Sequence, residues 1–343
     1  MEDIKEFDLK ELESEFLSLG IKAYHARQVF SWIYKRGVLD FSHMSDIPRK
    51  LKELLAGKFY ISELKLLKLL KSEDLTQKLL LGLKDGNCVE AVIIPTRERV
   101  TVCVSSQVGC KFGCNFCASG MLGFKRNLST GEIIDEIINL KDRAPDNKLT
   151  NLVFMGTGEP MDNYANVIKA IRIINSGQGF NIGARKITIS TSGVIPGIES
   201  LSREELQIEL SVSLHAADDK LRSQLMPVNK KYPLEELIKA CKEYSLKTNR
   251  QVTFEYILIK DVNASIKNAQ DLVKLLEDFK LSKVNIIPFN PIKEFGAKSA
   301  DKDTIILFQD YLARHGVHAI LRKERGEDIG AACGQLRLSR VNN

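Results

Sequence analysis

The chain has 343 residues, 44% hydrophobic and 27% charged, an ordinary globular composition that can bury a full core without disulfides in one large domain with a smaller companion. Lys and Arg exceed Asp and Glu by 50 to 44, a formal charge of +6, which permits a polyanionic partner but is too diffuse to require one. The start MEDIKEFDLK lacks the segments of a signal peptide and no apolar run reaches the roughly 18 to 20 residues that cross a bilayer, so we expect a cytoplasmic protein with reduced thiols and no membrane insertion.

The first 60 residues are predicted to form a small helical module. In LKELESEFLSLG the apolar residues recur at the spacing of one helix face until Gly20 ends the pattern. The segments AYHARQVFSWIYKRG and PRKLKELLAGKF continue the helical pattern. Residues 1–60 are therefore interpreted as a helical accessory module.

Residues 61–99 show a different pattern, with short apolar runs near period two. The runs LKLLKLL, QKLLLGL and CVEAVIIP are separated by SED and KDGN, which are typical turn sequences. We expect antiparallel strands here, connecting the helical module to the rest of the chain.

From residue 100 to residue 343, apolar strand-like runs alternate with amphipathic helical runs such as TGEIIDEIINLKDR and YANVIKAIRIIN. This βαβα order is typical of a parallel sheet covered by helices. Roughly six or seven parallel strands are too few for a closed eight-stranded barrel, so the prediction is an α/β fold with an open or partial (β/α) barrel and ligands at the carboxyl ends of its strands. The predicted strands are TVCVSS, NLVFM, KITIS, IELSVSL, VTFEYILI, VNIIPF and VHAIL.

The stretch CKFGCNFC brings Cys110, Cys114 and Cys117 together in a short segment. Structural zinc takes four ligands, usually from two separated CxxC pairs, and only one such pair is present. A cubane iron–sulfur cluster has four irons, so three cysteines hold three corners and leave one iron open for another ligand. The triplet therefore favours a 4Fe-4S cluster. A zinc site with Cys103 as its fourth ligand and a set of unligated thiols are the alternatives.

Polar residues follow several of the predicted strands. MGTGEP places Gly158 and Glu159 after one strand, where a glycine turn allows close approach to a ligand and a carboxylate can accept from an ammonium group. Such turns are common in α/β folds, but several that converge on one rim indicate a polar pocket. The other candidates lie in STSG, SLH and PFN and are Ser190, Ser213, Leu214, His215 and Asn290.

The CxxxCxxC spacing resembles the signature of the radical S-adenosylmethionine superfamily. The resemblance implies a 4Fe-4S cluster on Cys110, Cys114 and Cys117, whose open iron chelates S-adenosylmethionine. It also implies that Gly158 and Glu159 contact the methionine part of this cofactor, and we expect the other strand-end residues to orient it.

A further set of segments resembles one family within this superfamily. VEAVIIPTRERVTVCVSSQVGC, ITISTSG, SLHAAD and AACGQLR are similar to the RlmN family of dual-specificity RNA methyltransferases, and the similarity includes the N-terminal module. It implies methylation of C2 of adenine, at adenosine 2503 of 23S rRNA and at adenosine 37 of certain tRNAs. C2 lies between two ring nitrogens and is too electron-poor to attack a sulfonium methyl group directly, so a radical route is needed.

In the family's scheme, one S-adenosylmethionine methylates a cysteine, which by motif match is Cys333, and a second supplies the radical that removes hydrogen from the S-methyl group. The carbon radical then adds to C2, which joins enzyme and RNA covalently. The implied proton acceptor is Glu90, with Cys103 as its rival. Cys103 finally attacks Cys333 to form a disulfide and release methylated RNA, which requires Cα atoms within about 7 Å.

Each of these residues also has a simpler interpretation. A lone cysteine near a C-terminus is usually a structural thiol, and a carboxylate on a strand is usually solvated. A related adenine C8 methyltransferase shares the cluster and both thiols. A glycyl-radical activase would need the cluster alone, and a zinc-bound RNA-binding module without catalysis would be colourless.

The partners implied are 23S rRNA and tRNA together with a flavodoxin-type electron donor, and we expect a monomer. The sequence does not identify which residues contact RNA. Basic residues of the N-terminal module, NKK (229–231) and LRKER (321–325) are equally suited to phosphate contact.

Overall fold

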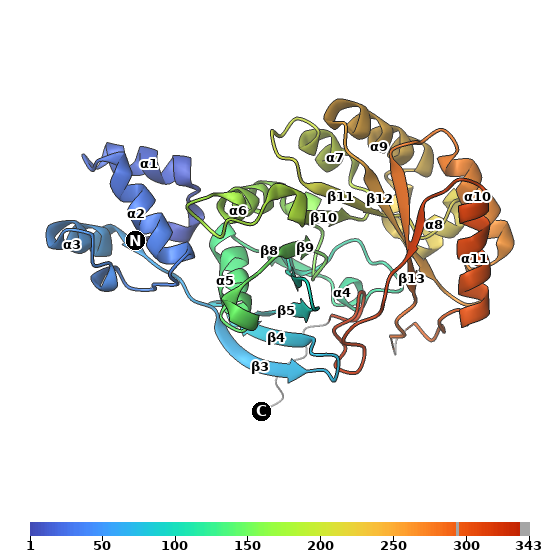
Figure 1. Cartoon of the computed structure of the whole chain (residues 1–343), viewed down its shortest axis with the longest axis horizontal. Coiled ribbons are helices and arrows are strands. Elements are labelled where there is room, and N and C mark those ends of the chain that lie inside the picture. The colour runs from blue at the N-terminus through green and yellow to red at the C-terminus, as the bar shows by residue number, and fades with distance from the viewer. Residues whose placement is uncertain (293–294, 337–343) are drawn as a thin grey trace.

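The computed structural model describes residues 1–292 and 295–336. Within them, ten strands form one sheet in the order β14-β13-β12-β11-β10-β9-β6-β5-β4-β3 (Figure 1). Because β14 and β3 are its two unpaired edges, the sheet curves without closing on itself. The predicted α/β class and partial barrel are confirmed.

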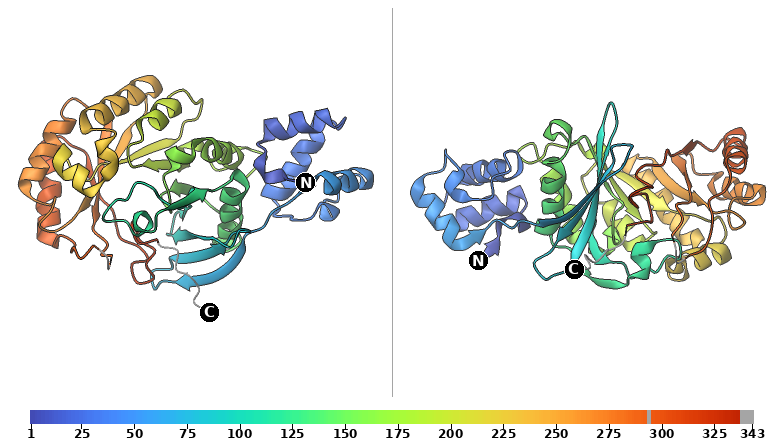
Figure 2. Two further views of the ribbon diagram at one scale, coloured as in Figure 1. Left: turned by 180° about the vertical axis from the view of Figure 1, so that it is seen from behind. Right: turned by 90° about the horizontal axis from the view of Figure 1, so that it is seen from below.

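Seven strands of this sheet are parallel neighbours, and helices connect them along its outer side (Figures 1 and 2). The strands are β6 (Val100–Cys103), β9 (Asn151–Phe154), β10 (Ile187–Thr191), β11 (Glu209–Ser213), β12 (Val252–Leu258), β13 (Ser282–Pro288) and β14 (Ala319–Leu321). The helices are α5 (Thr130–Lys141), α6 (Tyr164–Asn175), α7 (Ile195–Leu201), α8 (Asp219–Leu225), α9 (Leu234–Thr248), α10 (Ile266–Leu276) and α11 (Lys302–Arg314).

The remaining three strands extend the sheet in the antiparallel direction, as predicted. They are β3 (Lys65–Lys71), β4 (Gln77–Gly82) and β5 (Cys88–Pro95). Before them come the helices α1 (Leu9–Ser18), α2 (Ala23–Tyr34) and α3 (Arg49–Lys58), which lie at one end of the molecule in Figure 1. The boundaries at residues 60 and 99 stay predictions.

The N-terminal helices are attached to the barrel through the start of the chain. A short parallel pair joins β1 (Glu2–Asp3) to β2 (Phe59–Tyr60). The carboxylate of Glu6 accepts hydrogen bonds from the backbone N–H groups of Thr130 and Gly131, at the N-terminus of α5, where the helix dipole favours a negative charge. A barrel helix therefore anchors the module.

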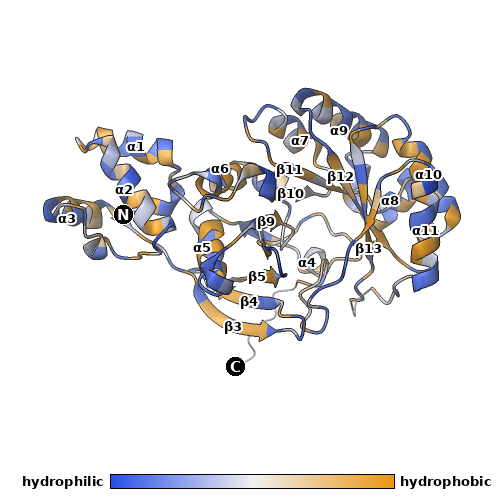
Figure 3. Cartoon of the chain, viewed as in Figure 1, coloured by the Kyte–Doolittle hydropathy of each residue, from blue (hydrophilic) through white to orange (hydrophobic). Residues whose placement is uncertain are grey.

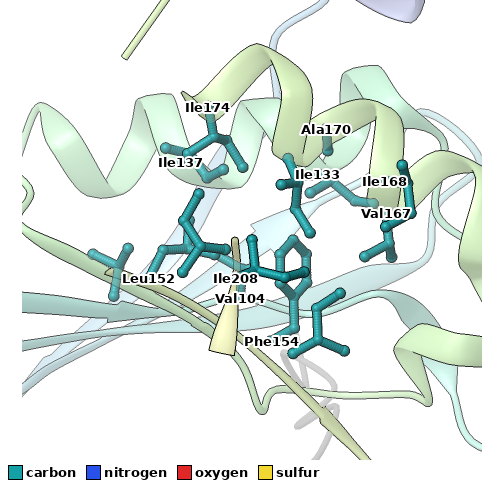
Figure 4. Close-up of a cluster of buried hydrophobic side chains, with 14 of the residues drawn as sticks. Val104, Ile133, Ile137, Leu152, Phe154, Val167, Ile168, Ala170, Ile174 and Ile208 are labelled. Atoms are coloured by element: carbon teal, nitrogen blue, oxygen red, sulfur yellow. The ribbon is translucent and has the colours of Figure 1, made fainter. Parts of the chain in front are cut away.

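A core cluster fills the space between β9 and the helices α5 and α6 (Figure 4). Leu152 and Phe154 of β9 face Ile133 and Ile137 of α5, and all four are at most 1% exposed. Burying each of these side chains contributes about 1.5–3 kcal/mol. Because side chains alternate along a strand, Val153 points to the opposite, inner face of the sheet.

The outer helices are amphipathic. Figure 3 shows both hydropathy colours along α9, α10 and α11, as expected of helices that cover a sheet with one face. No helix within residues 1–292 and 295–336 is long and apolar enough to cross a membrane.

The chain after β14 crosses the open side of the barrel, and we call residues 322–336 the crossing segment. It is held near β4, where the Lys78 ammonium group donates to the carbonyl of Gly330 at 3.0 Å. It is held again near the cysteine triplet, where the Ala118 N–H donates to the carbonyl of Gly334 at 2.8 Å. The crossing segment thereby brings its cysteine to the rim of the barrel. The last residue of the AACGQLR motif, at position 337, lies outside the described residues.

Candidate active site

One cavity at the carboxyl ends of the parallel strands gathers most of the predicted site residues. Three of the predicted residues, Glu90, Cys103 and Leu214, are not in its lining. The predicted residues that line it are Cys110, Cys114, Cys117, Gly158, Glu159, Ser190, Ser213, His215, Asn290 and Cys333. Strand ends that are far apart in sequence therefore share one rim, as expected for parallel strands.

The three cysteines lie on a loop between β7 (Gln107–Gly109) and the short helix α4 (Ala118–Met121). Burial raises the pKa of the Cys114 thiol most, and the charges of Cys117 and Cys110 raise it further. The three sulfurs are thus close enough to influence one another. Among the described residues no three His, Cys, Asp or Glu groups form a ready-made site for one metal ion. The three thiols do line one wall of the cavity.

The turn after β7 requires glycine. The backbone of Gly109 has φ +77°, and a Cβ built there would lie 1.7 Å from the carbonyl oxygen of Gly123. The strand β8 (Phe124–Asn127) pairs with β7 across this contact. This close contact between the paired strands fixes where the cysteine loop begins.

The residues present fit a polar cofactor bound beside these thiols. The Oγ atom of Ser192 and the Oδ1 atom of Asn290 are buried and have no hydrogen-bond partner in the described part of the chain. Both residues line the cavity. Because a buried polar group without a partner costs about 1–3 kcal/mol, these two atoms indicate that a ligand completes their hydrogen bonds. Thiolates are the ligands that iron–sulfur clusters take.

Gly158 and Glu159 form the rim of the cavity after β9. Gly158 has φ +101°, and a Cβ there would lie 2.5 Å from Cβ of Gln107. The Glu159 carboxylate is buried, and its oxygens accept from the backbone N–H groups of Met161 at 3.0 Å and Ser192 at 2.7 Å. Burial raises the pKa of Glu159, and these hydrogen bonds oppose the shift. The carboxylate therefore joins the ends of β9 and β10.

Replacing Glu159 by Gln is expected to weaken cofactor binding while iron content stays intact. The amide offers one acceptor to two N–H donors, so its NH2 group must face a backbone donor and one hydrogen bond is lost, at a cost of about 1–3 kcal/mol. The measurement is the Kd for S-adenosylmethionine together with iron content. Unchanged affinity and full turnover in Glu159→Gln would show that this carboxylate has no role in cofactor binding.

His215 lies in the cavity wall as a neutral imidazole. Its Nδ1 accepts from the backbone N–H of Ile257 at 3.1 Å, so the ring proton is on Nε2. Burial, followed by the charge of Arg222, lowers the pKa of His215 to about 3. The ring stands edge-on to Phe116 in the cysteine loop. His215 can therefore donate one hydrogen bond to a ligand and carries no charge.

Leu214 has a supporting position instead of a lining one. Its side chain is fully buried in the core. Its carbonyl accepts from the Arg222 guanidinium, Nε at 3.1 Å. The same guanidinium donates to the carbonyls of Ser192 and Ser213 at 2.8 and 2.9 Å. Leu214 thus contributes through its backbone.

Arg222 is a structural residue of the site that sequence reasoning missed. It is fully buried, and burial lowers its pKa to about 10. By holding two strand ends together it positions the side chains on the rim. In DKLRSQL it has the spacing of an exposed helical arginine, so no pattern distinguishes it.

The crossing segment brings two further thiols, Cys103 and Cys333, to the same part of the barrel. Cys103 ends β6 and packs with Val92, Ala331 and Leu336. Burial raises the pKa of the Cys103 thiol most, and the charge of Cys333 is the next cause. Cys333 is exposed and Cys103 is buried, so the pair joins an accessible thiol to a protected one.

Glu90 lies beside this pair without lining the cavity. It is 1% exposed, which excludes a solvated carboxylate. In the β5–β6 register Val92 is opposite Cys103, and Glu90, two residues from Val92, shares that face of the sheet. The Lys78 ammonium group lies 3.3 Å from its carboxylate. Glu90 and Cys103 are thus diagonal neighbours on the inner face.

Arg322 and Glu255 are further residues that sequence reasoning did not assign to the site. The Nη1 atom of Arg322 lies 3.4 Å from a carboxylate oxygen of Glu255 and 3.6 Å from the sulfur of Met155. The charge of Cys333 is the largest cause that raises the pKa of Arg322. The sequence could have pointed to Glu255, because it is the one charged residue in the apolar run VTFEYILI, where a charged side chain is uncommon.

A triplet of thiols at the carboxyl ends of a partial parallel barrel defines a radical S-adenosylmethionine enzyme. The family model of the Radical SAM superfamily matches residues 104–273. This membership implies S-adenosylmethionine and a 4Fe-4S cluster as cofactors. A second model, of the ribosomal RNA large subunit methyltransferase N-terminal domain, matches residues 2–61.

Relatives that match over nearly the full length identify the family within this superfamily of enzymes. The chain is 45% identical over 338 residues to the probable dual-specificity RNA methyltransferase RlmN of Thermoanaerobacter sp. (strain X514), covering 98% of both. It is 44% identical over 334 residues to the dual-specificity RNA methyltransferase RlmN of Syntrophobacter fumaroxidans, covering 97% of both. The crystal structure of a radical SAM methyltransferase from Sphaerobacter thermophilus superposes with a TM-score of 0.93 at 42% identity, covering 99% of this chain and 100% of that one. The chain belongs to the RlmN family of radical S-adenosylmethionine RNA methyltransferases.

Proposed function

We propose that the enzyme methylates C2 of adenine in RNA, at adenosine 2503 of 23S rRNA and adenosine 37 of tRNAs, through a methyl group carried by Cys333. The observation that supports this is the packing of Cys103 with Ala331 and Leu336, which flank Cys333 in the crossing segment and bring the two thiols to the same part of the barrel. An enzyme that only cleaves its cofactor needs neither thiol. One that carries a methyl group on sulfur needs both, the second to release the product.

The cofactor site is assigned to residues of the cavity lining. Cys110, Cys114 and Cys117 would hold the cluster, while Ser192 and Asn290 offer polar atoms that lack a partner. The other rim residues, Gly158, Glu159, Ser190, Ser213 and His215, would orient S-adenosylmethionine. When bound, these cofactors supply a methyl group and a radical that abstracts hydrogen.

Cys333 is the nucleophile that accepts the methyl group. It is exposed, and its carbonyl accepts from the Asn290 side chain at 3.3 Å. After hydrogen is removed from the methyl group, the carbon forms a bond to C2 of adenine. The protein and the RNA are then joined by a thioether.

Release requires a base and a second thiol. Glu90 is buried next to Cys103 on the inner face and forms an ion pair with Lys78, so we assign it the C2 proton, with Cys103 as the rival. The adduct also gives up its unpaired electron, which the redox cofactor would accept. The Cys103 thiolate then bonds to the sulfur of Cys333 as the carbon–sulfur bond breaks, the released carbon takes up a proton to complete the methyl group, and a disulfide remains on the enzyme.

The proposed function is tested with RNA deuterated at C2 or at C8 of the target adenine. Anaerobically purified enzyme should be brown, contain iron and sulfide, and consume two S-adenosylmethionine per methyl group. We expect loss of the C2 label from both a 23S rRNA fragment and a tRNA. Retention of the C2 label with loss of the C8 label would assign the enzyme to the related C8 reaction.

The proposal also includes a flavodoxin-type electron donor, a monomeric enzyme and a cytoplasmic location. Sedimentation of the purified protein checks the monomer. Reduction by purified flavodoxin, followed by absorbance of the cluster, checks the donor.

A further inference from the structure

A second cavity of about 1060 Å³ lies inside the partial barrel, toward the amino-terminal ends of the parallel strands. We call it the lower groove. Closed barrels fill this space with bulky branched side chains. Here the inward positions carry small polar residues, among them Thr188, Ser211 and Thr253. The sequence therefore leaves the interior open and hydrophilic.

The lower groove adjoins the cofactor cavity. On β11 the inward residues Glu209 and Ser211 line the lower groove, and Ser213, the next inward residue, lines the cofactor cavity. On β10, Thr188 lines the lower groove and Ser190, the next inward residue, lines the cofactor cavity. Met155, Glu255 and Arg322 line both cavities. The ion pair of Glu255 with Arg322 thus lies where the two meet.

The lower groove is strongly basic. Seven Arg and Lys side chains line it against two Glu side chains. Both glutamates are already paired with arginines, Glu209 with Arg250 and Glu255 with Arg322. The remaining cations include four with no carboxylate within ion-pair distance in the described part of the chain, which are Arg99, Arg185, Lys283 and Lys323.

The position of these cations points to a polyanion rather than to general surface charge. Arg99 and Arg185 precede β6 and β10, so they stand at the amino-terminal mouth of the barrel. Lys283 is half-buried inside the groove on β13. Arg99, Arg185 and Lys323 are exposed, and cations gathered on one concave surface raise the local concentration of a polyanion there.

We infer that the phosphate backbone of a single-stranded RNA segment binds in the lower groove and presents its target base to the cofactor cavity from below. This rests on the proposed RNA methyltransferase function and adds the route of entry. An enzyme that acts on a base must take it out of the stack. Because the lower groove adjoins the cofactor cavity, an extruded base would pass Met155, Glu255 and Arg322, while the backbone phosphates stay with Arg185, Lys283 and Lys323.

The inference selects among the three basic segments that the sequence left open. The three basic residues of LRKER, Arg322, Lys323 and Arg325, all line the lower groove. Lys230 and Lys231 of NKK do not line it and are exposed. The latter pair therefore makes a matched control of equal charge.

The test compares Lys283→Glu/Lys323→Glu with Lys230→Glu/Lys231→Glu, each as cluster-loaded enzyme under anaerobic conditions. The probe is a labelled RNA hairpin with an unpaired adenine in its loop, and the readout is Kd as a function of salt. We expect the groove pair to lose at least about tenfold in affinity and to reduce the salt slope by about two, one for each phosphate contact. The control pair should change Kd less than twofold.

Iron content and thermal unfolding show whether each variant is folded, and Lys283→Gln/Lys323→Gln replaces the groove pair if the glutamates prevent folding. Equal losses in both pairs, or wild-type affinity in the groove pair, would overturn the inference. So would a fully paired duplex that binds as tightly as the hairpin. Because Kd is measured without turnover, the result stands apart from the test of C2 methylation.

Discussion

Cys103→Ala is expected to accumulate enzyme covalently joined to RNA. The variant keeps Cys333, which can be methylated and bonded to C2, but it lacks the thiol that breaks the carbon–sulfur bond. After one turnover with labelled RNA, a denaturing gel should show a shifted band that nuclease removes. The wild-type enzyme should show little of this band, because Cys103, which packs with Ala331 two residues before Cys333, is expected to resolve it.

Cys333→Ala provides the contrast, since without this thiol no methyl group can be loaded. It should form neither methylated RNA nor an adduct, and in the double variant the shifted band of Cys103→Ala should disappear. If both thiols were only packing residues, each Ala change would cost about 1 kcal/mol of stability and affect activity similarly. Equal adduct-free activity in the two single variants would falsify the thiol mechanism.

Cys114→Ala is expected to abolish the cluster and all activity. Three thiolates line the wall, and removing one opens a second corner of the cubane, which then degrades. The purified variant should be nearly colourless, contain little iron and sulfide, and fail to cleave S-adenosylmethionine under reduction. Cys110→Ala and Cys117→Ala should behave alike.

Cys88→Ala is the matched control for this series. Cys88 starts β5, is half-buried and does not line the cavity, so its variant should keep colour and iron. A stable brown Cys114→Ala protein with full cofactor cleavage would show that the cluster uses other ligands.

Much of the fold was predictable because local pattern and global fold agree. The runs KITIS and IELSVSL became β10 and β11 within a residue or two of their ends. Helix α5 begins at a capping box between Ser129 and Glu132, which is a local signal. Strand direction followed from the alternation of strands and helices, since a helical crossover returns the chain so that the next strand runs parallel to the previous one.

The rim of the cofactor cavity was predictable for the same reason. Parallel strands end on one side of the sheet, so polar residues after separate strands, such as Glu159 and Asn290, had to meet. Leu214 shows the limit, because adjacent residues at a strand end point in different directions. Its side chain entered the core and only its backbone supports the site.

The sequence by itself determined the α/β pattern, the cysteine triplet and the family, because periodicity, spacing and short motifs are local properties of the chain. Tertiary structure decided which distant groups touch. Only the path of the crossing segment brings Cys333 to Cys103. Only tertiary packing buries Arg222, whose guanidinium hydrogen-bonds to the ends of two strands. The basic lower groove likewise exists because the barrel curves without closing and its inward residues are small and polar. Contacts of this kind depend on where the whole chain goes, which no local pattern records.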